Sequence, residues 1–316
     1  MATTTLRPRS TSMGSSTRAG RRSHPIARWL KYGGPVRFLF ILPTLLVFGL
    51  FAWWPIVRSL GISLQQTNFV TTRWVGLENF TRVFADPLLG TATVNTIWFA
   101  ALALVIGFPV PLLLAVAVSE MRRARGIASV LAYMPVILPP VVATLLWKAF
   151  YDPSSTGLFN SIFGSVGMDP IPWLNNGDLA MPAIVVQATW ASFGTATIIY
   201  LASLMSIGPE LYEAAEVDGA GFFRRIWHIT LPQLRSVILV LVLLQIIGTL
   251  QVFAEPFIMT GGGPENRTVT ILMLIYRYAF ISGDYGRATA LSLLLAVALT
   301  LVSLIYLRLT KKWSSS

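Results

Sequence analysis

Six long apolar stretches constrain the fold of this chain more than any other feature. About 20 consecutive apolar residues allow a helix to cross the ~30 Å hydrocarbon layer of a membrane, and a spanning segment must satisfy its own backbone hydrogen bonds. Only 12% of the residues are charged, against about 25% in soluble domains. The sequence therefore predicts an all-α, polytopic membrane protein with six transmembrane helices. The predicted spans are residues 38–58, 93–119, 127–150, 180–205, 236–257 and 287–308.

The residue types that are absent exclude several classes of function. The 316 residues include no cysteine and only two histidines, His24 and His228. Disulfides, thiol catalysis and histidine-rich metal sites are therefore excluded. The sequence contains no G-x-x-x-x-G-K-[ST] loop, so any ATP must be bound by another chain. We expect no catalytic residue, metal or cofactor in this chain, and we expect that it is not an enzyme.

The positions of Lys and Arg predict an orientation. A net charge of +11 would favour nucleic acid as the partner of a soluble protein. Here the basic residues lie beside apolar stretches, so we expect a lipid membrane and no nucleic acid. They concentrate in residues 1–37, after the second and fourth spans and at the C-terminus, which predicts that both termini and these loops are cytoplasmic. Residues 151–178 contain no Lys or Arg and are predicted to lie outside.

Residues 1–37 form a basic tail that contains no acidic residue and is rich in Ser, Thr and Arg. This composition predicts a largely disordered cytoplasmic tail. A secretory signal is the alternative, but the apolar stretch that follows lacks a clear small-x-small cleavage site. We therefore interpret residues 38–58 as an uncleaved first span.

The segment 209–232, between the fourth and fifth spans, is too polar to cross a membrane. Pro209 suits the first turn of a helix, and three glutamates follow in the early turns, where carboxylates are favoured. Gly219 permits a sharp turn, after which a second short amphipathic helix is predicted to end at Pro232. One interpretation is an interfacial helix-turn-helix that only links two spans. The other is a docking surface, which explains why four acids lie close together on the positive side.

This segment resembles the EAA loop of the membrane subunits of ABC importers. The family pattern E-A-A-x-x-x-G, nine residues, then I-x-L-P is matched by Glu213, Ala214, Ala215, Gly219, Ile229, Leu231 and Pro232. The resemblance implies a type I ABC-importer permease bundle over residues 38–312, whose cytoplasmic coupling helix docks on an ATPase subunit. It implies this coupling role for Glu213, Ala214, Ala215, Glu216, Asp218, Gly219, Ala220 and Pro232.

Two further motifs narrow the resemblance to the carbohydrate-uptake, maltose-type branch. Residues 74–80, Trp-Val-Gly-Leu-Glu-Asn-Phe, continue with Asp86-Pro87 and Asn95-Thr96 and resemble the outer segment of carbohydrate-importer subunits. Residues 259–264, Met-Thr-Gly-Gly-Gly-Pro, resemble the Gly-Gly-Pro loop of subunits similar to the larger maltose-importer membrane subunit.

The resemblance also implies a set of partners and a location. The partners are a second permease subunit, two cytoplasmic ATPase subunits that bind ATP and Mg, and an extracellular solute-binding protein. The location is the plasma or inner membrane of a bacterium or archaeon. The implied function is import of a sugar or oligosaccharide by alternating access.

Polar side chains within spans are candidates for the solute path, because they are costly in a membrane. Gln245 and Thr249 share a helix face, which Val252 and Pro256 are predicted to continue. An indole suits the CH face of a sugar. Hydrogen bonding between helices is the alternative role for the amides and hydroxyls. The candidates are Gln245, Thr249, Gln251, Trp190 and Gln187.

Other functions are less consistent with the sequence. An ion-coupled carrier would need inverted repeats or a buried ionisable relay, and neither is found. An ABC importer for another solute, such as a glycerol-phosphate ester, would need Arg or Lys in its path. None is evident in the interior of the spans, because Arg58, Lys148, Arg287 and Arg308 lie at or near their ends. Arginines of the loops could still reach inward, so this alternative stays open. A membrane enzyme would need catalytic groups, which are lacking. Glu255, near the outer end of the fifth span, is expected to cap a kink or to pair with Arg267.

Overall fold

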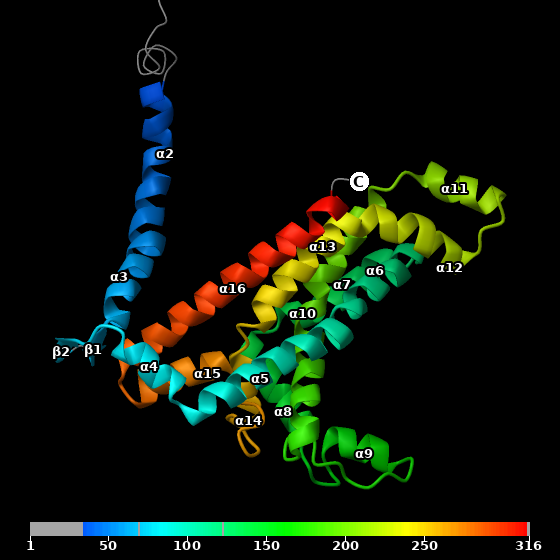
Figure 1. The fold of residues 1–316 in the computed structure, drawn as a ribbon. Coiled ribbons are helices and arrows are strands. Elements are labelled where there is room, and N and C mark those ends of the chain that lie inside the picture. Colours follow the sequence, from blue (N-terminus) through cyan, green and yellow to red (C-terminus); the bar gives the residue numbers. More distant parts are fainter. Residues whose placement is uncertain (1–33, 69, 122, 315–316) are drawn as a thin grey trace, which may run out of the picture. The chain divides into compact units, whose positions relative to one another are not determined.

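The computed structural model describes residues 34–68, 70–121 and 123–314, so most of the predicted disordered tail lies outside the described residues. The described chain is helical apart from two short strands (Figure 1), which confirms the all-α prediction. It divides into two compact units, Met1–Val57 and Arg58–Ser316. Five of the described helices are long and apolar enough to cross a membrane, or six if one bent pair counts as a single span.

The first unit contains one long apolar helix. It starts with α2 (Gly34–Phe48), continues through the π-helical turn η1 (Gly49–Trp53) and enters α3 (Trp54–Ser63). Together these elements give a candidate span, Val36–Ser63, and no residue of its most apolar window is buried. A continuous exposed apolar surface of this kind is typical of a segment that contacts lipid or another protein.

The second unit contains the other long apolar helices. The first of them, Pro87–Glu120, is built from α5 (Pro87–Leu102), η2 (Ala103–Gly107) and α6 (Pro109–Glu120). The other continuous ones are α10 (Gly177–Met205), the helix formed by α12 (Phe222–Arg225), η3 (Ile226–Thr230) and α13 (Leu231–Thr249), and α16 (Tyr285–Ser314). α10 contacts α5, α6, α7, α8, α13 and α14 and is therefore the central helix of this unit.

The stretch predicted as the third span, residues 127–150, is a pair of helices. α7 (Arg125–Ile137) and α8 (Pro140–Phe150) meet at an angle of 94°. Leu138 between them is extended, because a residue that precedes proline is disfavoured in the helical region. α7 packs closely on α10 at Gly194, where an added Cβ would lie 2.5 Å from the carbonyl oxygen of Ala132.

Three of the four π-helical turns in the described residues end two residues before a proline, namely Pro55, Pro109 or Pro232. Proline has no backbone N–H, and its ring clashes with the carbonyl four residues earlier. A widened turn relieves both problems without breaking the helix. The prediction that Pro232 ends a short helix is therefore wrong, because the chain is one continuous helix from Phe222 to Thr249.

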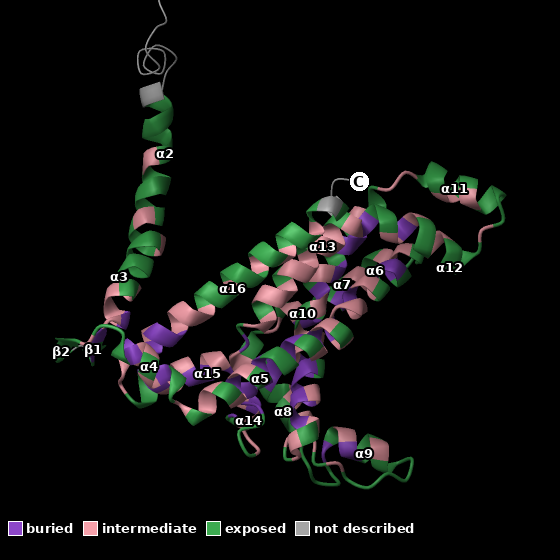
Figure 2. Ribbon diagram, in the orientation of Figure 1, coloured by how far each residue is buried: buried purple, intermediate pink, exposed green. Residues whose placement is uncertain are grey.

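Short elements gather at two opposite ends of the second unit (Figure 1). One end, called the α11 end here, carries α11 (Pro209–Val217) and the last turns of α16, and α11 is almost wholly exposed (Figure 2). The other, called the α14 end, carries the antiparallel strands β1 (Gln65–Thr67) and β2 (Thr72–Trp74), α4 (Glu78–Phe84), α9 (Leu158–Gly164), α14 (Ala254–Thr260), α15 (Ile271–Tyr276) and the π-helical turn η4 (Arg277–Ile281).

Candidate functional site: a cavity between spans and an exposed coupling segment

A cavity of about 650 Å³ lies between three spans of the second unit. Its walls come from the region around η2, from α10, and from α13 with the residues that follow it. Apolar residues dominate the lining, and the polar side chains in it are Thr189, Ser192, Thr195, Tyr200, Gln245, Thr249, Gln251 and Glu255. The structure thus brings together the three candidates predicted from the fifth span, Gln245, Thr249 and Gln251.

Gln245 joins two walls of this cavity. Its Nε2 donates a 2.7 Å hydrogen bond to the carbonyl oxygen of Ala103, the first residue of η2. The same carbonyl accepts the N–H of Phe108 at 3.0 Å, which is the wide bond of the π-helical turn. Gly107, the last residue of η2, allows η2 to lie close to α10, since a Cβ there would be 2.8 Å from Thr189 Oγ1. Gln245 is therefore both a lining residue and a link between spans.

The side chains of Thr249 and Gln251 each donate a hydrogen bond to the backbone carbonyl four residues earlier. Thr249 Oγ1 donates to the carbonyl of Gln245 at 2.8 Å, and Gln251 Nε2 donates to that of Ile247 at 3.0 Å. The hydroxyl and amide oxygens of these side chains are acceptors. Because both residues line the cavity, these oxygens can accept hydrogen bonds from the hydroxyls of a solute.

The helix that carries Gln245 ends earlier than the apolar stretch. α13 stops at Thr249, and α14 starts only at Ala254. Between them the carbonyl of Val252 leaves the helical ladder and accepts a 2.9 Å bond from Thr270 Oγ1. The predicted helix face from Thr249 through Val252 to Pro256 is therefore wrong, because those residues do not belong to one helix.

Gln187 and Trp190 lie outside the cavity lining. Gln187 is buried, and its Nε2 lies 3.5 Å from Thr144 Oγ1 of α8. The ring of Trp190 packs 5.4 Å from that of Trp147, also on α8. Both side chains therefore face α8, whereas the residues of α10 that face α13 line the cavity.

Glu255 is half-buried at the start of α14 and also lines the cavity. The expected ion pair with Arg267 is not among those of the described residues. The side chain of Arg267 lies against Gly177 instead, because a Cβ built there would be 3.2 Å from its Cγ.

The first part of segment 209–232, α11, projects from the α11 end, whereas Ile226 and Thr230 near its end pack on the bundle. α11 contains no buried residue, and Glu213, Ala214 and Glu216 are exposed. The helix ends as Ala220 donates its N–H to the carbonyl of Ala215 at 2.8 Å. Of the remaining predicted coupling residues, Asp218, Gly219 and Pro232 are exposed, while Ala215 and Ala220 are half-buried. Gly219 has a φ of 72°, the left-handed conformation that favours glycine.

Two side-chain contacts hold α11 against the helix that follows it. Tyr212 Oη lies 3.1 Å from Thr230 Oγ1 in η3. Glu216 and Arg225 form an ion pair at 3.8 Å, with most of the glutamate side chain exposed. The hydroxyl contact is therefore the firmer of the two attachments, since an exposed ion pair contributes little.

The two outer motifs found in the sequence bind each other at the α14 end. Asn95 Nδ2 donates to the carbonyls of Asn266 at 2.8 Å and Val269 at 3.0 Å, just after the Gly-Gly-Gly-Pro turn. Thr96 Oγ1 accepts the N–H of Ile271 at 3.0 Å. Motifs that are about 170 residues apart in the sequence are thus one structural element.

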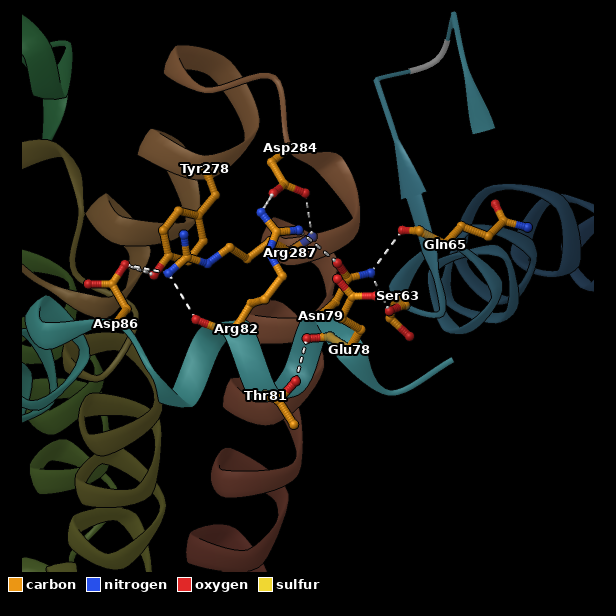
Figure 3. Close-up of polar contacts among 10 residues, drawn as sticks. All are labelled: Ser63, Gln65, Glu78, Asn79, Thr81, Arg82, Asp86, Tyr278, Asp284 and Arg287. Atoms are coloured by element: carbon orange, nitrogen blue, oxygen red, sulfur yellow. Dashed lines mark hydrogen bonds and ion pairs between the residues drawn. The ribbon is translucent and has the colours of Figure 1, made fainter. Parts of the chain in front are cut away.

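A second group of contacts, called the brace here, joins α4 to the start of α16 (Figure 3). Arg82 pairs with Asp284, and Arg287 pairs with Asp86, each at 2.5 Å. The hydroxyl of Tyr278 donates to Asp86 Oδ2 at 2.6 Å. The guanidinium of Arg287 lies 4.0 Å from the centre of the Tyr278 ring.

Asp86 is ionised within the brace. Burial by itself raises its pKa, but hydrogen bonds from Tyr278 and from the N–H of Leu88, together with the charge of Arg287, outweigh that effect. The pKa of Asp86 is therefore below the ordinary value of 3.8. Burial and the bond to Asp86 raise the pKa of Tyr278, which keeps its hydroxyl protonated as a donor.

Residues 107–315 match the family described as the binding-protein-dependent transport system inner membrane component. This chain belongs to that family. The matched region contains both α10 and α13, which form two walls of the cavity, and the whole segment 209–232. The chain is thus a multi-pass transport subunit of a membrane.

The permease is similar to known relatives over most of its length. It is 32% identical over 286 residues to the probable ABC transporter permease protein YurN of Bacillus subtilis, covering 88% of this chain and 97% of that protein. It is 33% identical over 273 residues to the trehalose/maltose transport system permease protein MalF of Thermococcus litoralis, covering 86% and 92%.

A solved structure supports the same assignment. A chain of the bacterial alginate ABC transporter, crystallised in complex with an alginate pentasaccharide-bound periplasmic protein, matches with a TM-score of 0.82. The match is 26% identical and covers 93% of this chain and 99% of that chain. Together with the relatives, it confirms the predicted resemblance to ABC-importer permeases of the maltose-type carbohydrate branch and the type I bundle.

Gln187 and Trp190 are the residues of α10 predicted for the solute path, whereas Thr189 and Ser192 line the cavity. Residues three apart on a helix share a face, so the spacing predicts that Gln187 and Trp190 lie on the same side of α10. The spacing does not identify the helix that this side contacts. The cavity-facing side of α10 is identified only by its packing on η2 and α13.

Gln245→Ala is expected to reduce the uptake rate of the permease several-fold with only a small loss of stability. The substitution removes one hydrogen bond between spans, with a typical net contribution of about 1 kcal/mol, and one polar group from the cavity. The measurement is initial uptake in proteoliposomes, normalised to folded permease. Gln187→Ala is the matched control, because that buried amide faces α8. Equal losses of uptake in the two variants would count against the cavity as the solute path.

Proposed function

We propose that this permease is one of two membrane subunits of an ATP-driven importer that moves a sugar or oligosaccharide by alternating access. The solute class is supported by the relatives, since MalF of Thermococcus litoralis is a trehalose/maltose permease. The mixed lining of the cavity is compatible with such a solute. Apolar walls can pack against the CH faces of a sugar, while side chains such as Gln245, Thr249 and Ser192 can exchange hydrogen bonds with its hydroxyls.

One continuous helix carries this proposal. It runs from Phe222, within the segment 209–232, to Thr249 in the cavity. α10, which leads into the segment from the other side, lines the same cavity. A tilt imposed on α11 and α12 is therefore transmitted along two helices to the cavity walls, as in a rigid-body transition.

The exposed segment is the proposed contact with a cytoplasmic ATPase subunit. Its acidic residues, Glu213, Glu216 and Asp218, are exposed and suit basic groups on a partner. The small side chains of Ala214 and Ala215 allow close seating. The contact between Tyr212 and Thr230 keeps α11 fixed to η3. A movement of docked α11 is therefore transmitted to η3 and α13.

The remaining partners are proposed from the same arrangement. A second permease subunit would cover the open side of the cavity, and two ATPase subunits would bind ATP and Mg. An extracellular solute-binding protein would deliver the solute at the α14 end. This orientation places the α11 end in the cytoplasm of a bacterial or archaeal cell, which agrees with the concentration of Lys and Arg at that end.

Uptake by the reconstituted complex tests the proposal. The permease is placed in vesicles with its partner permease, the ATPase subunits and the binding protein, and a panel of labelled oligosaccharides is offered. We expect accumulation of at least one sugar that requires both ATP hydrolysis and the binding protein. Accumulation without nucleotide hydrolysis, or no uptake of any sugar, would contradict the proposed function.

Because the permease has no cysteine, single introduced cysteines can test its orientation directly. Glu213→Cys on α11 should react with a membrane-impermeant thiol reagent only from the cytoplasmic side. Asp169→Cys, in the loop after α9, should react only from outside. The readout is labelling of intact cells against inverted vesicles. The reverse pattern would place α11 outside the cell and eliminate it as an ATPase contact.

A further inference from the structure

We propose that the cavity of this permease discriminates against anionic sugars, and that Glu255 is the residue responsible. This inference rests on the proposed function and narrows its substrate class to oligosaccharides without acidic groups. The alginate importer to which the chain is similar handles an acidic polysaccharide. The shared fold therefore does not determine the charge of the solute, and residues that line the cavity must do so.

The position of Glu255 is the first observation. It is the second residue of α14, directly after the break that follows α13, and its half-buried side chain lines the cavity. Within the described residues it forms no ion pair. Its negative charge is therefore not neutralised within the described part of this subunit.

The absence of positive charge from the lining is the second observation. No Lys, Arg or His of the described residues lines the cavity. Lys148, on α8, reaches the same short helix, but its Nζ donates to the carbonyl of Ile258 at 2.9 Å. A carboxylated sugar would thus meet one negative charge and no cation on this side of the path.

The wall next to Glu255 is aromatic. Phe253 lines the cavity and stacks on Phe257 with ring centres 5.0 Å apart, and both rings pack against Tyr276. Of these three rings only Phe253 lines the cavity, where it provides apolar surface for the CH face of a sugar. Like charges a few ångströms apart repel strongly when water is partly excluded. The wall therefore favours a neutral ring and disfavours a uronate.

The test compares two forms of one sugar. The reconstituted complex is first assayed with neutral oligosaccharides, and the best one is then compared with the same sugar oxidised to a carboxylate at C6. Binding of both forms to the binding protein is measured separately, and both are used at saturation. We expect uptake of the neutral form to exceed that of the oxidised form by at least about tenfold.

Two variants identify the residue. In Glu255→Gln the ratio of neutral to oxidised uptake should fall to about twofold, because the amide keeps the shape and removes the charge. Glu265→Gln is the matched control, since Glu265 is exposed at the α14 end outside the cavity, and it should leave the ratio unchanged. ATP-driven uptake of both forms at equal rates in the wild type would overturn the inference. An unchanged ratio in Glu255→Gln would do so too. Absence of ATP-driven uptake of every sugar would instead refute the proposed function.

Discussion

Glu213→Lys is expected to abolish ATP-driven uptake while the permease stays folded in the membrane. Glu213 is exposed on α11, and it forms no ion pair in the described part of the chain. Its replacement therefore removes no such contact within this subunit. At a docking surface, reversal of one charge replaces attraction by repulsion and costs several kcal/mol. We expect a loss of uptake of about 100-fold or more, measured in proteoliposomes at equal permease content.

The same charge change elsewhere provides the control. Glu120→Lys alters an exposed glutamate at the end of α6, outside the segment 209–232, and should retain uptake driven by ATP. Copurification with the ATPase subunits distinguishes a loss of ATPase binding from a loss of the coupled helix movement. Glu213→Lys should no longer copurify with the ATPase subunits. Normal uptake by Glu213→Lys would eliminate α11 as the coupling contact.

Gly219→Asp should also abolish uptake, for a different reason. A Cβ at Gly219 would meet no atom of this chain within 4 Å, so the variant introduces no steric clash inside the subunit. The left-handed backbone with a φ of 72° makes the substitution unfavourable by about 1 kcal/mol. A side chain at the tip of the segment would also hold α11 away from a closely seated partner. Membrane abundance near that of the wild type, with uptake lost, is the expected result.

Much of the helical fold was predictable because the dominant signal was length. Runs of apolar residues longer than about 20 demand a spanning helix whatever their neighbours are. The segment 209–232 stood out for the opposite reason, since its clustered acids are costly in lipid. Both signals are local in the sequence, and neither depends on which residues pack together.

The misinterpreted features depend on distant contacts. The break after Thr249 lies within the predicted fifth span, and it is held by Thr270, whose hydroxyl donates to the carbonyl of Val252. The orientation of Gln187 depends on Thr144 of α8. In both cases the hydropathy and the helical period of a segment do not identify the hydrogen-bond partner, because the partner belongs to another element of the fold.

The contacts made by the two outer motifs were also not predictable from the sequence. Their residues were recognised by resemblance, but their physical roles were not predictable. Asn79 Nδ2 donates to the carbonyls of Ser63 at 2.9 Å and Gln65 at 2.8 Å and so fixes the start of β1 (Figure 3). Asn95 does the same for the backbone after the Gly-Gly-Gly-Pro turn. Each asparagine binds backbone carbonyls, which no sequence pattern identifies in advance.

Arg287→Met is expected to cause the largest loss of stability among the variants considered. The side chains of Arg287 and Asp86 are only 20% and 13% exposed, and the substitution leaves the carboxylate of Asp86 without its cation. Removal of one partner from a buried pair typically costs about 3–5 kcal/mol. The measurement is the thermal unfolding midpoint of the purified permease in detergent. Arg225→Met is the matched control, because its partner Glu216 is 78% exposed, and it should shift the midpoint little.

The dependence on pH distinguishes the buried charge from a simple loss of packing. The folded-state pKa of Asp86 is lowered, so its ionised form stabilises the fold at any pH above the ordinary aspartate pKa, and this contribution is lost as the pH falls through the folded value. The midpoint difference between wild type and Asp86→Asn should therefore be constant from neutral pH to about pH 5 and shrink below about pH 4. Asp86→Asn combined with Arg287→Met should recover part of the stability that Arg287→Met loses, because no unpaired carboxylate remains. If the double variant is as unstable as the sum of the single ones, the brace contributes through shape and not through charge.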